Sequence, residues 1–83
     1  MEINPIAALN RTFALSKTNG KQEAIIEAEK LQLTTNPYYF VLIGELYEGI
    51  DNKKAKQHFE KALSLIKTNA DKTVISKRIS GLN

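Results

Sequence analysis

The sequence predicts an all-α domain of five helices, and three observations carry this prediction. An Asn-Pro pair occurs twice, at Asn4-Pro5 and at Asn36-Pro37. Asparagine is a good N-cap, and proline suits the first helical position because its missing N–H would be unpaired there anyway. Apolar residues recur at three- and four-residue spacing along the chain, and no segment alternates apolar and polar residues as a half-buried strand would. The helices are therefore expected to pack on one another without a sheet.

The first helix is expected to begin at Pro5 and to end at Asn19-Gly20, because glycine tolerates the left-handed conformation that follows a helix. Its inner face is predicted to carry Ile6, Leu9, Phe13 and Ala14. Asn19 also suits the N-cap of the second helix, with Gln22 as its capping-box partner. The second helix is expected to run to about Leu33, with Ala24, Ile25, Ala28 and Leu31 on its inner face.

The third helix is predicted over about 37–48, where Gly49 breaks it, and the fourth over about 52–67, with Asp51 or Asn52 as its cap. The inner face of the fourth helix is predicted to carry Ala55, Phe59, Ala62, Leu63 and Ile66. The Thr68-x-x-Asp71 pattern is typical of a capping box and starts a fifth helix near Ala70. Its apolar residues are Val74, Ile75, Ile79 and Leu82.

Composition indicates one small domain of 83 residues inside the cell. The chain has no cysteine, which excludes disulfides and thiolate metal sites and favours a reducing cytoplasm. The longest apolar runs, such as residues 40–43, are too short to span a bilayer, and residues 1–5 show no basic start of a signal peptide. We therefore expect a cytoplasmic protein that does not enter a membrane.

The net charge of +3 arises in the C-terminal half, where Lys53, Lys54, Lys56 and Lys61 cluster on the fourth helix. A basic cluster can bind nucleic acid. Acidic residues such as Glu60 interrupt this one, however, and a solvated lysine face is the favoured interpretation. Direct contact of this segment with nucleic acid is thus not expected.

Residue patterns that would indicate an enzyme are missing. His58 is the only histidine and has no cysteine or second histidine with which to share a metal ion. The serines have no base partner that the sequence implies, and the four glycines are isolated rather than gathered in a phosphate loop. We expect no catalytic residues, no metal and no cofactor.

An internal repeat relates the two halves of the chain. A shift of 31 residues places Leu9 on Phe40, Ala24 on Ala55, Ala28 on Phe59 and Leu31 on Ala62. Two helix pairs followed by a final amphipathic helix would form a minimal solenoid, in which the last helix covers the apolar face that a third repeat would otherwise cover. The open end of such a stack can also pair with a second copy, so a homodimer is compatible with the sequence.

The second half has the residue spacing of a tetratricopeptide repeat. It reads Phe40-x2-Ile43-Gly44-x2-Tyr47 and then Ala55-x3-Phe59-x2-Ala62. The chain therefore resembles the tetratricopeptide superfamily. The resemblance implies a right-handed solenoid of two antiparallel hairpins, repeat one at 5–33 and repeat two at 37–67, with a capping helix at 70–82. It also implies that small residues allow close approach of the helices and that large ones fill the space between hairpins.

Family members bind peptides or partner proteins on the concave face, which the first helix of each hairpin lines. Many bind acidic peptide termini through Lys and Asn at fixed positions, and Asn10 and Arg11 match such positions, whereas Ala14, Val41 and Glu45 do not. Tyr38 and Tyr39 are further candidates, since tyrosine is favoured at binding hot spots. For both tyrosines, packing in the core is an equally good interpretation.

A second resemblance covers nearly the whole chain. Residues 4–11 (NPIAALNR) resemble the S/N-P-x-x-A-L-N-R opening of the C-terminal extension of a group of extracytoplasmic-function-type RNA polymerase sigma factors. The stretches Tyr38 to Tyr47, Ala55 to Leu65 and Asn69 to Leu82, which includes Arg78, match later motifs of that extension in order. The resemblance implies a C-terminal piece of such a factor, with its promoter-melting and −35-reading domains upstream.

The sequence thus predicts a non-catalytic, regulatory protein-interaction domain that contacts the factor's own DNA-binding domains or RNA polymerase. The alternative is a freestanding adaptor that binds a peptide or a partner protein in the groove of its first and third helices. The residues expected to contact the partner are Asn10, Arg11, Tyr38, Tyr39 and Arg78.

Overall fold

Five α-helices make up the fold of the computed structural model, which describes residues 4–82. Their bounds are α1 Pro5–Asn19, α2 Lys21–Leu31, α3 Pro37–Tyr47, α4 Asn52–Leu65 and α5 Asn69–Ser80. No strand occurs in this part of the chain, so the all-α prediction is confirmed. The expected domain bounds of 1–83 include residues 1–3 and 83, which lie outside the described range. The prediction that residues 1–5 do not start a signal peptide also falls partly on residues 1–3.

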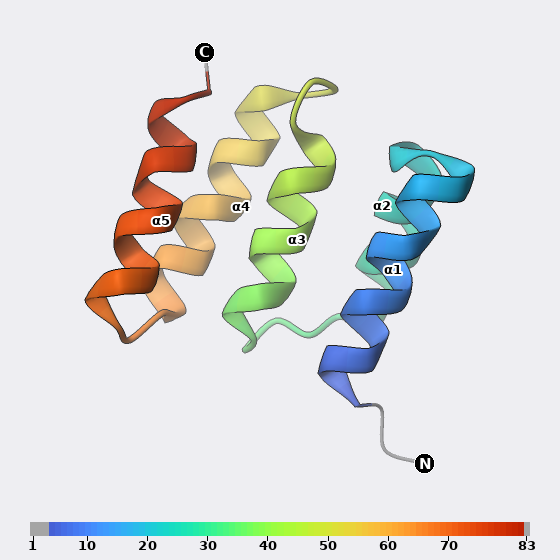
Figure 1. The fold of residues 1–83 in the computed structure, drawn as a ribbon, viewed down its shortest axis with the longest axis horizontal. Helices are drawn as coiled ribbons and strands as arrows, with labels where there is room; N and C mark the ends of the chain where they lie inside the picture. The colour runs from blue at the N-terminus through green and yellow to red at the C-terminus, as the bar shows by residue number, and fades with distance from the viewer. Residues whose placement is uncertain (1–3, 83) are drawn as a thin grey trace.

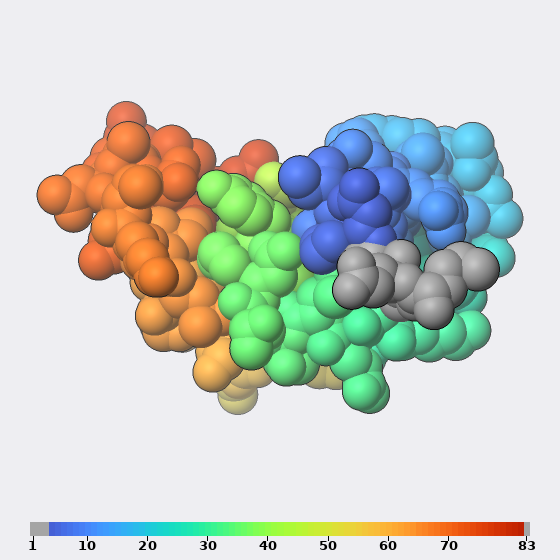
Figure 2. All heavy atoms as spheres, turned by 90° about the horizontal axis from the view of Figure 1, so that it is seen from below, coloured from blue at the N-terminus to red at the C-terminus, as the bar shows by residue number. Residues whose placement is uncertain are grey.

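Successive helices run in alternating directions and pack on their sequence neighbours (Figure 1). In addition, α1 packs on α3. Seen along the helices, α1, α3 and α5 lie on one side of the molecule, and α2 and α4 lie on the other (Figure 2). The same view shows α3 set back between α1 and α5. The first, third and fifth helices therefore frame a shallow hollow.

The caps that the sequence predicts form as expected at four helix starts. Asn4 Oδ1 accepts hydrogen bonds from the N–H groups of Ile6 and Ala7 at 3.0 and 3.3 Å. Asn36 accepts from Tyr38 N–H at 2.9 Å, and Asp51 accepts from Lys54 N–H at 3.1 Å. These bonds satisfy N–H groups that have no partner inside the helix.

Thr68 caps α5 as predicted, but the Asp71 carboxylate bonds the Thr68 hydroxyl instead of the Thr68 backbone N–H that a capping box would use. The Thr68 hydroxyl oxygen accepts from the Asp71 N–H at 3.3 Å, and the hydroxyl donates to the Asp71 carboxylate at 2.9 Å. The cap of α2 differs from the prediction. Asn19 is the last residue of α1, and its amide donates to Glu23 at 3.2 Å, so Asn19 does not cap α2. Gly20, at φ 96°, occupies the N-cap position instead.

Helix ends also differ slightly from the sequence expectations. The second helix stops at Leu31 rather than Leu33, because Gln32 adopts a left-handed conformation at φ 49° and ψ 41°. The fourth helix stops at Leu65, since Ile66 is extended. Gly49, at φ 82°, follows α3 as predicted and takes a conformation that side chains other than glycine rarely adopt.

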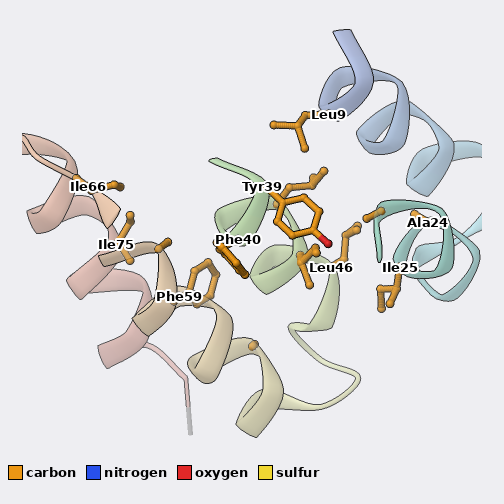
Figure 3. Packing of buried hydrophobic residues seen from close by; sticks show 14 residues of the cluster. Leu9, Ala24, Ile25, Tyr39, Phe40, Leu46, Phe59, Ile66 and Ile75 are labelled. Atoms are coloured by element: carbon orange, nitrogen blue, oxygen red, sulfur yellow. The ribbon is translucent and has the colours of Figure 1, made fainter. Parts of the chain in front are cut away.

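One continuous hydrophobic core extends from Leu9 in α1 to Ile75 in α5 (Figure 3). The third helix lies at its centre and buries most of its side chains. Its buried residues are Tyr39, Phe40, Leu42, Ile43, Gly44 and Leu46. The tightest contact joins α3 to α4, where a Cβ atom at Gly44 would lie only 2.7 Å from the fully buried ring of Phe59. The predicted close approach at Gly44 is therefore confirmed.

The inner faces of α2 and α4 are confirmed, whereas those of α1 and α5 are partly wrong. In α2 the residues Ala24, Ile25 and Ala28 are buried, with Leu31 half-buried. In α4 the residues Ala55, Phe59, Ala62 and Ile66 are buried, with Leu63 half-buried. In α5 only Ile75 is buried, Ile79 and Leu82 are half-buried, and Val74 is 59% exposed.

The first helix buries a different face from the predicted one. Of the four expected residues, only Leu9 is buried, and Ile6, Phe13 and Ala14 are exposed. Ala8 and Thr12 are buried in their place, and the Thr12 hydroxyl donates to the Ala8 carbonyl at 2.9 Å. The reason is that α1 stands at one end of the row of helices, so α2 and α3 cover only part of its surface.

Candidate functional site

An apolar groove of about 350 Å³ lies between α1 and α3. We call this surface the α1–α3 groove, and its lining residues are Ile6, Leu9, Asn10, Phe13, Asn36, Tyr38, Val41, Leu42 and Glu45. Ile6 is 71% exposed, Tyr38 57% and Phe13 45%. Three large apolar or aromatic side chains thus project from the walls of one groove, and such clusters commonly mark interaction sites.

Two of the predicted contact residues, Asn10 and Tyr38, lie in this groove on opposite walls. Asn10 follows the buried Leu9 on α1, and its amide is exposed. Tyr38 occupies the first turn of α3, where Pro37 and the Asn36 cap fix the backbone. An amide and a phenol on either side of an apolar floor can bind the backbone and side chains of a docked segment.

Arg11 is separated from them. It lies on the other side of α1, in a crevice of about 550 Å³ between α1 and α2 that Glu23 and Glu27 also line. The sequence neighbours Asn10 and Arg11 therefore do not form a common site in this structure, because adjacent helical residues point about 100° apart.

Tyr39 is in the core and is not available to a partner. Its side chain is only 5% exposed and meets the ring of Phe40 edge-on, with 5.1 Å between the ring centroids. Figure 3 shows the hydroxyl pointing toward α2. Burial raises the pKa of this hydroxyl, and the nearby charge of Glu29 raises it further. The core interpretation of Tyr39 is confirmed, and its burial argues against the predicted contact with a partner.

Arg78 joins α5 to α3 through a pair of carboxylates. Its two terminal nitrogens lie 3.2 Å from Glu45 and 3.2 Å from Glu48. The guanidinium carbon also lies 6.0 Å from the centroid of the Phe59 ring, within range of a cation–π contact. We call Arg78, Glu45 and Glu48 the Arg78 triad. Its first role is to hold α5 in place, which the sequence did not indicate.

A second polar cluster connects the two halves of the chain on the side of α2 and α4. The Tyr47 hydroxyl donates to Glu29 of α2 at 2.9 Å. The Tyr47 ring stacks on His58 of α4, at 5.4 Å between centroids. Tyr47 thus connects α2 with α4, and burial together with the bond to Glu29 raises its pKa to about 12.

His58 makes a hydrogen bond within α4 that the sequence does not indicate. Its Nδ1–H donates to the Lys54 carbonyl oxygen at 2.8 Å, one turn back along α4. Its ring lies between Tyr47 and Phe40, with centroid distances of 5.4 and 6.3 Å. Within residues 4–82, no three His, Cys, Asp or Glu side chains lie close enough together to hold a metal ion.

Comparisons with protein-family models, with curated proteins and with solved structures returned no match to this chain. None of the helices described is long and apolar enough to cross a membrane.

Proposed function

We propose that this chain is a non-catalytic, regulatory protein-interaction domain whose partner docks in the α1–α3 groove. The observation that carries the proposal is the exposure of Ile6, Phe13 and Tyr38 on the walls of that groove. Leaving three such side chains in water is unfavourable, and a partner that covered them would gain about 25 cal/mol per Å² of apolar surface buried.

We further propose that the helices form two tetratricopeptide-like hairpins closed by α5. Alternating helix direction supports this arrangement, and so does the burial of positions that the 31-residue shift aligns. Ala24 and Ala55 are both fully buried, as are Ala28 and Phe59. Leu9 and Phe40 are each 9% exposed. In such a stack α1, α3 and α5 line the concave face, on which the groove lies.

The order of motifs along the chain supports a regulatory domain at the C-terminus of a bacterial sigma factor. On this proposal, the groove binds the factor's own DNA-binding domains or RNA polymerase and so tunes transcription initiation in the cytoplasm. Asn10 and Tyr38 would contact the partner directly. Arg78 would contribute indirectly, by holding α5 beside Glu45, a residue of the groove.

The test is to delete the segment from its parent gene and to measure transcription from a cognate promoter. We expect output to change at least severalfold while the level of the truncated factor stays the same. Unchanged output at equal protein level would contradict the regulatory role.

A freestanding adaptor is the second candidate, and the same groove favours it, because a groove that binds a domain of the same chain can equally bind a separate peptide. The reading frame upstream distinguishes the two. A continuous frame that encodes a helix-turn-helix supports the sigma-factor proposal, and a stop codon supports the adaptor.

A further inference from the structure

Charged residues of opposite sign lie beside the α1 wall of the α1–α3 groove, at Lys17, and in its α3 wall, at Glu45. On α1, Lys17 lies one turn after Phe13, and its Nζ is 5.0 Å from the centroid of the Phe13 ring. Lys17 makes no ion pair with any other residue between 4 and 82. On α3, Glu45 lines the groove and belongs to the Arg78 triad. Two carboxylates share one guanidinium in that triad, so the triad as a whole keeps a net charge of −1.

The order of these groups along the groove is the same on both walls. The first and third helices run in the same direction (Figure 1). Ile6 and Tyr38 lie near their N-terminal ends, whereas Lys17 and Glu45 lie toward their C-terminal ends. Ile6 and Tyr38 therefore lie at one end of the groove, and the oppositely charged Lys17, beside the α1 wall, and Glu45, in the α3 wall, lie toward the other.

This arrangement is complementary to itself. A two-fold axis along the groove, parallel to the helices, places α1 of each copy in front of α3 of the other. Lys17 of one copy then faces Glu45 of the second, and Ile6 faces Tyr38, with both contacts occurring twice. Such reciprocity is what a closed dimer requires. The hollow over α3, between α1 and α5, gives the second copy's α1 a place to lie (Figure 2).

We propose that the α1–α3 groove is covered by a second copy of this chain, in a two-fold dimer with parallel helices. Phe13 is the central contact, because its ring lies midway along the α1 wall between Ile6 and Lys17. The dimer masks the surface on which the proposed partner docks, so dimerisation and partner binding compete. The inference depends on the groove alone and is independent of the sigma-factor assignment.

Sedimentation velocity of the intact chain over a range of concentrations tests the proposal. We expect a concentration-dependent dimer that Phe13→Glu weakens at least about 100-fold, since each dimer loses two buried aromatic contacts and the two new carboxylates draw Lys17 away from Glu45 of the second copy. The matched control is Ile26→Glu, which changes a side chain that is 58% exposed on α2, outside the groove. This variant is expected to dimerise like the original chain.

Mixing two charge variants tests the geometry. Lys17→Glu and Glu45→Lys should each self-associate poorly, whereas their equimolar mixture should form a heterodimer, since both contacts then join opposite charges. Circular dichroism checks that each variant is folded. If Glu45→Lys disturbs α5, the Phe13→Glu and Ile26→Glu pair decides the question. A monomer at all concentrations, or a dimer that Phe13→Glu leaves unchanged, overturns the proposal while leaving the promoter assay of the proposed function unaffected.

Discussion

At the scale of single residues, Phe59 anchors the packing. It is completely buried between α3 and α4 and lies beside Arg78 of α5. Phe59→Ala should therefore lower the free energy of unfolding by roughly 3–5 kcal/mol, a large part of the stability of a domain of this size. Urea denaturation gives the value. A loss well under 1 kcal/mol would mean that the helices are stacked in a different register.

Gly44 is the partner of Phe59 in the tightest contact. A Cβ atom there would lie 2.7, 2.8 and 3.0 Å from three atoms of the ring. Gly44→Ala gains about 1 kcal/mol in helix propensity, but crowding a buried ring typically costs 1–3 kcal/mol, so we expect net destabilisation. Thermal melting of this variant and of Gly44→Ala with Phe59→Leu tests the cause. The smaller side chain should recover part of the loss, and a more stable single variant would contradict the contact.

Tyr47 gives the stability a pH dependence. Its pKa is raised from 10.0 to about 12, chiefly by burial and then by the bond to Glu29. Below pH 10 the hydroxyl is protonated in both the folded and the unfolded chain. Between about pH 10 and 12 the unfolded chain loses this proton first, so stability falls as pH rises. Denaturation at several pH values should show a shallower fall for Tyr47→Phe, and identical slopes would contradict the assignment.

The two tyrosines Tyr38 and Tyr39 show what residue patterns can and cannot decide. The two are neighbours of the same residue type, yet Tyr38 is 57% exposed and Tyr39 only 5%. Helical spacing does not separate them, because Tyr39 lies one turn before the buried Ile43 and Tyr38 one turn before the buried Leu42. The Arg78 triad joins residues 30 and 33 positions apart, and no local pattern in the sequence indicates that pairing.

At the scale of helices, the residue at which a helix begins is easier to predict from the sequence than the face that the helix buries. Caps depend on residues two or three positions apart, so Asn4, Asn36, Asp51 and Thr68 act as the sequence indicates. Spacing shows which residues share a face, but not which neighbour covers that face. The outer helices α1 and α5 have fewer neighbours, and for this reason Ile6, Phe13 and Val74 are exposed where spacing predicted burial.

The fifth helix is held by few contacts, so its ion pairs should be measurable. Only Ile75 is fully buried in α5, and Arg78 provides its link to α3. Arg78→Gln should lower stability by up to about 1 kcal/mol and should increase amide hydrogen exchange in α5 more than in α1. Lys77→Gln is the control, because it removes a neighbouring cation in the same last turn. Equal effects of the two variants would mean that the triad contributes nothing.

At the scale of the whole molecule, the packing of α1 on α3 brings exposed side chains of both helices into one surface. The groove forms because α1 and α3 pack side by side and leave Ile6, Phe13 and Tyr38 uncovered. Sequence spacing assigned two of these residues to the core, so it could not outline the groove. The resemblance to a tetratricopeptide repeat nevertheless predicts that the first and third helices line the binding face.

The most direct test of the central claim is to introduce Ile6→Glu or Ile26→Glu into the proposed parent sigma factor and to measure transcription from a cognate promoter. Both variants replace an exposed isoleucine by a carboxylate, but only Ile6 lies in the groove. We expect Ile6→Glu to change promoter output at least severalfold and Ile26→Glu to leave it unchanged, at equal protein levels. Equal output from the two variants would contradict the claim that the α1–α3 groove is the functional surface.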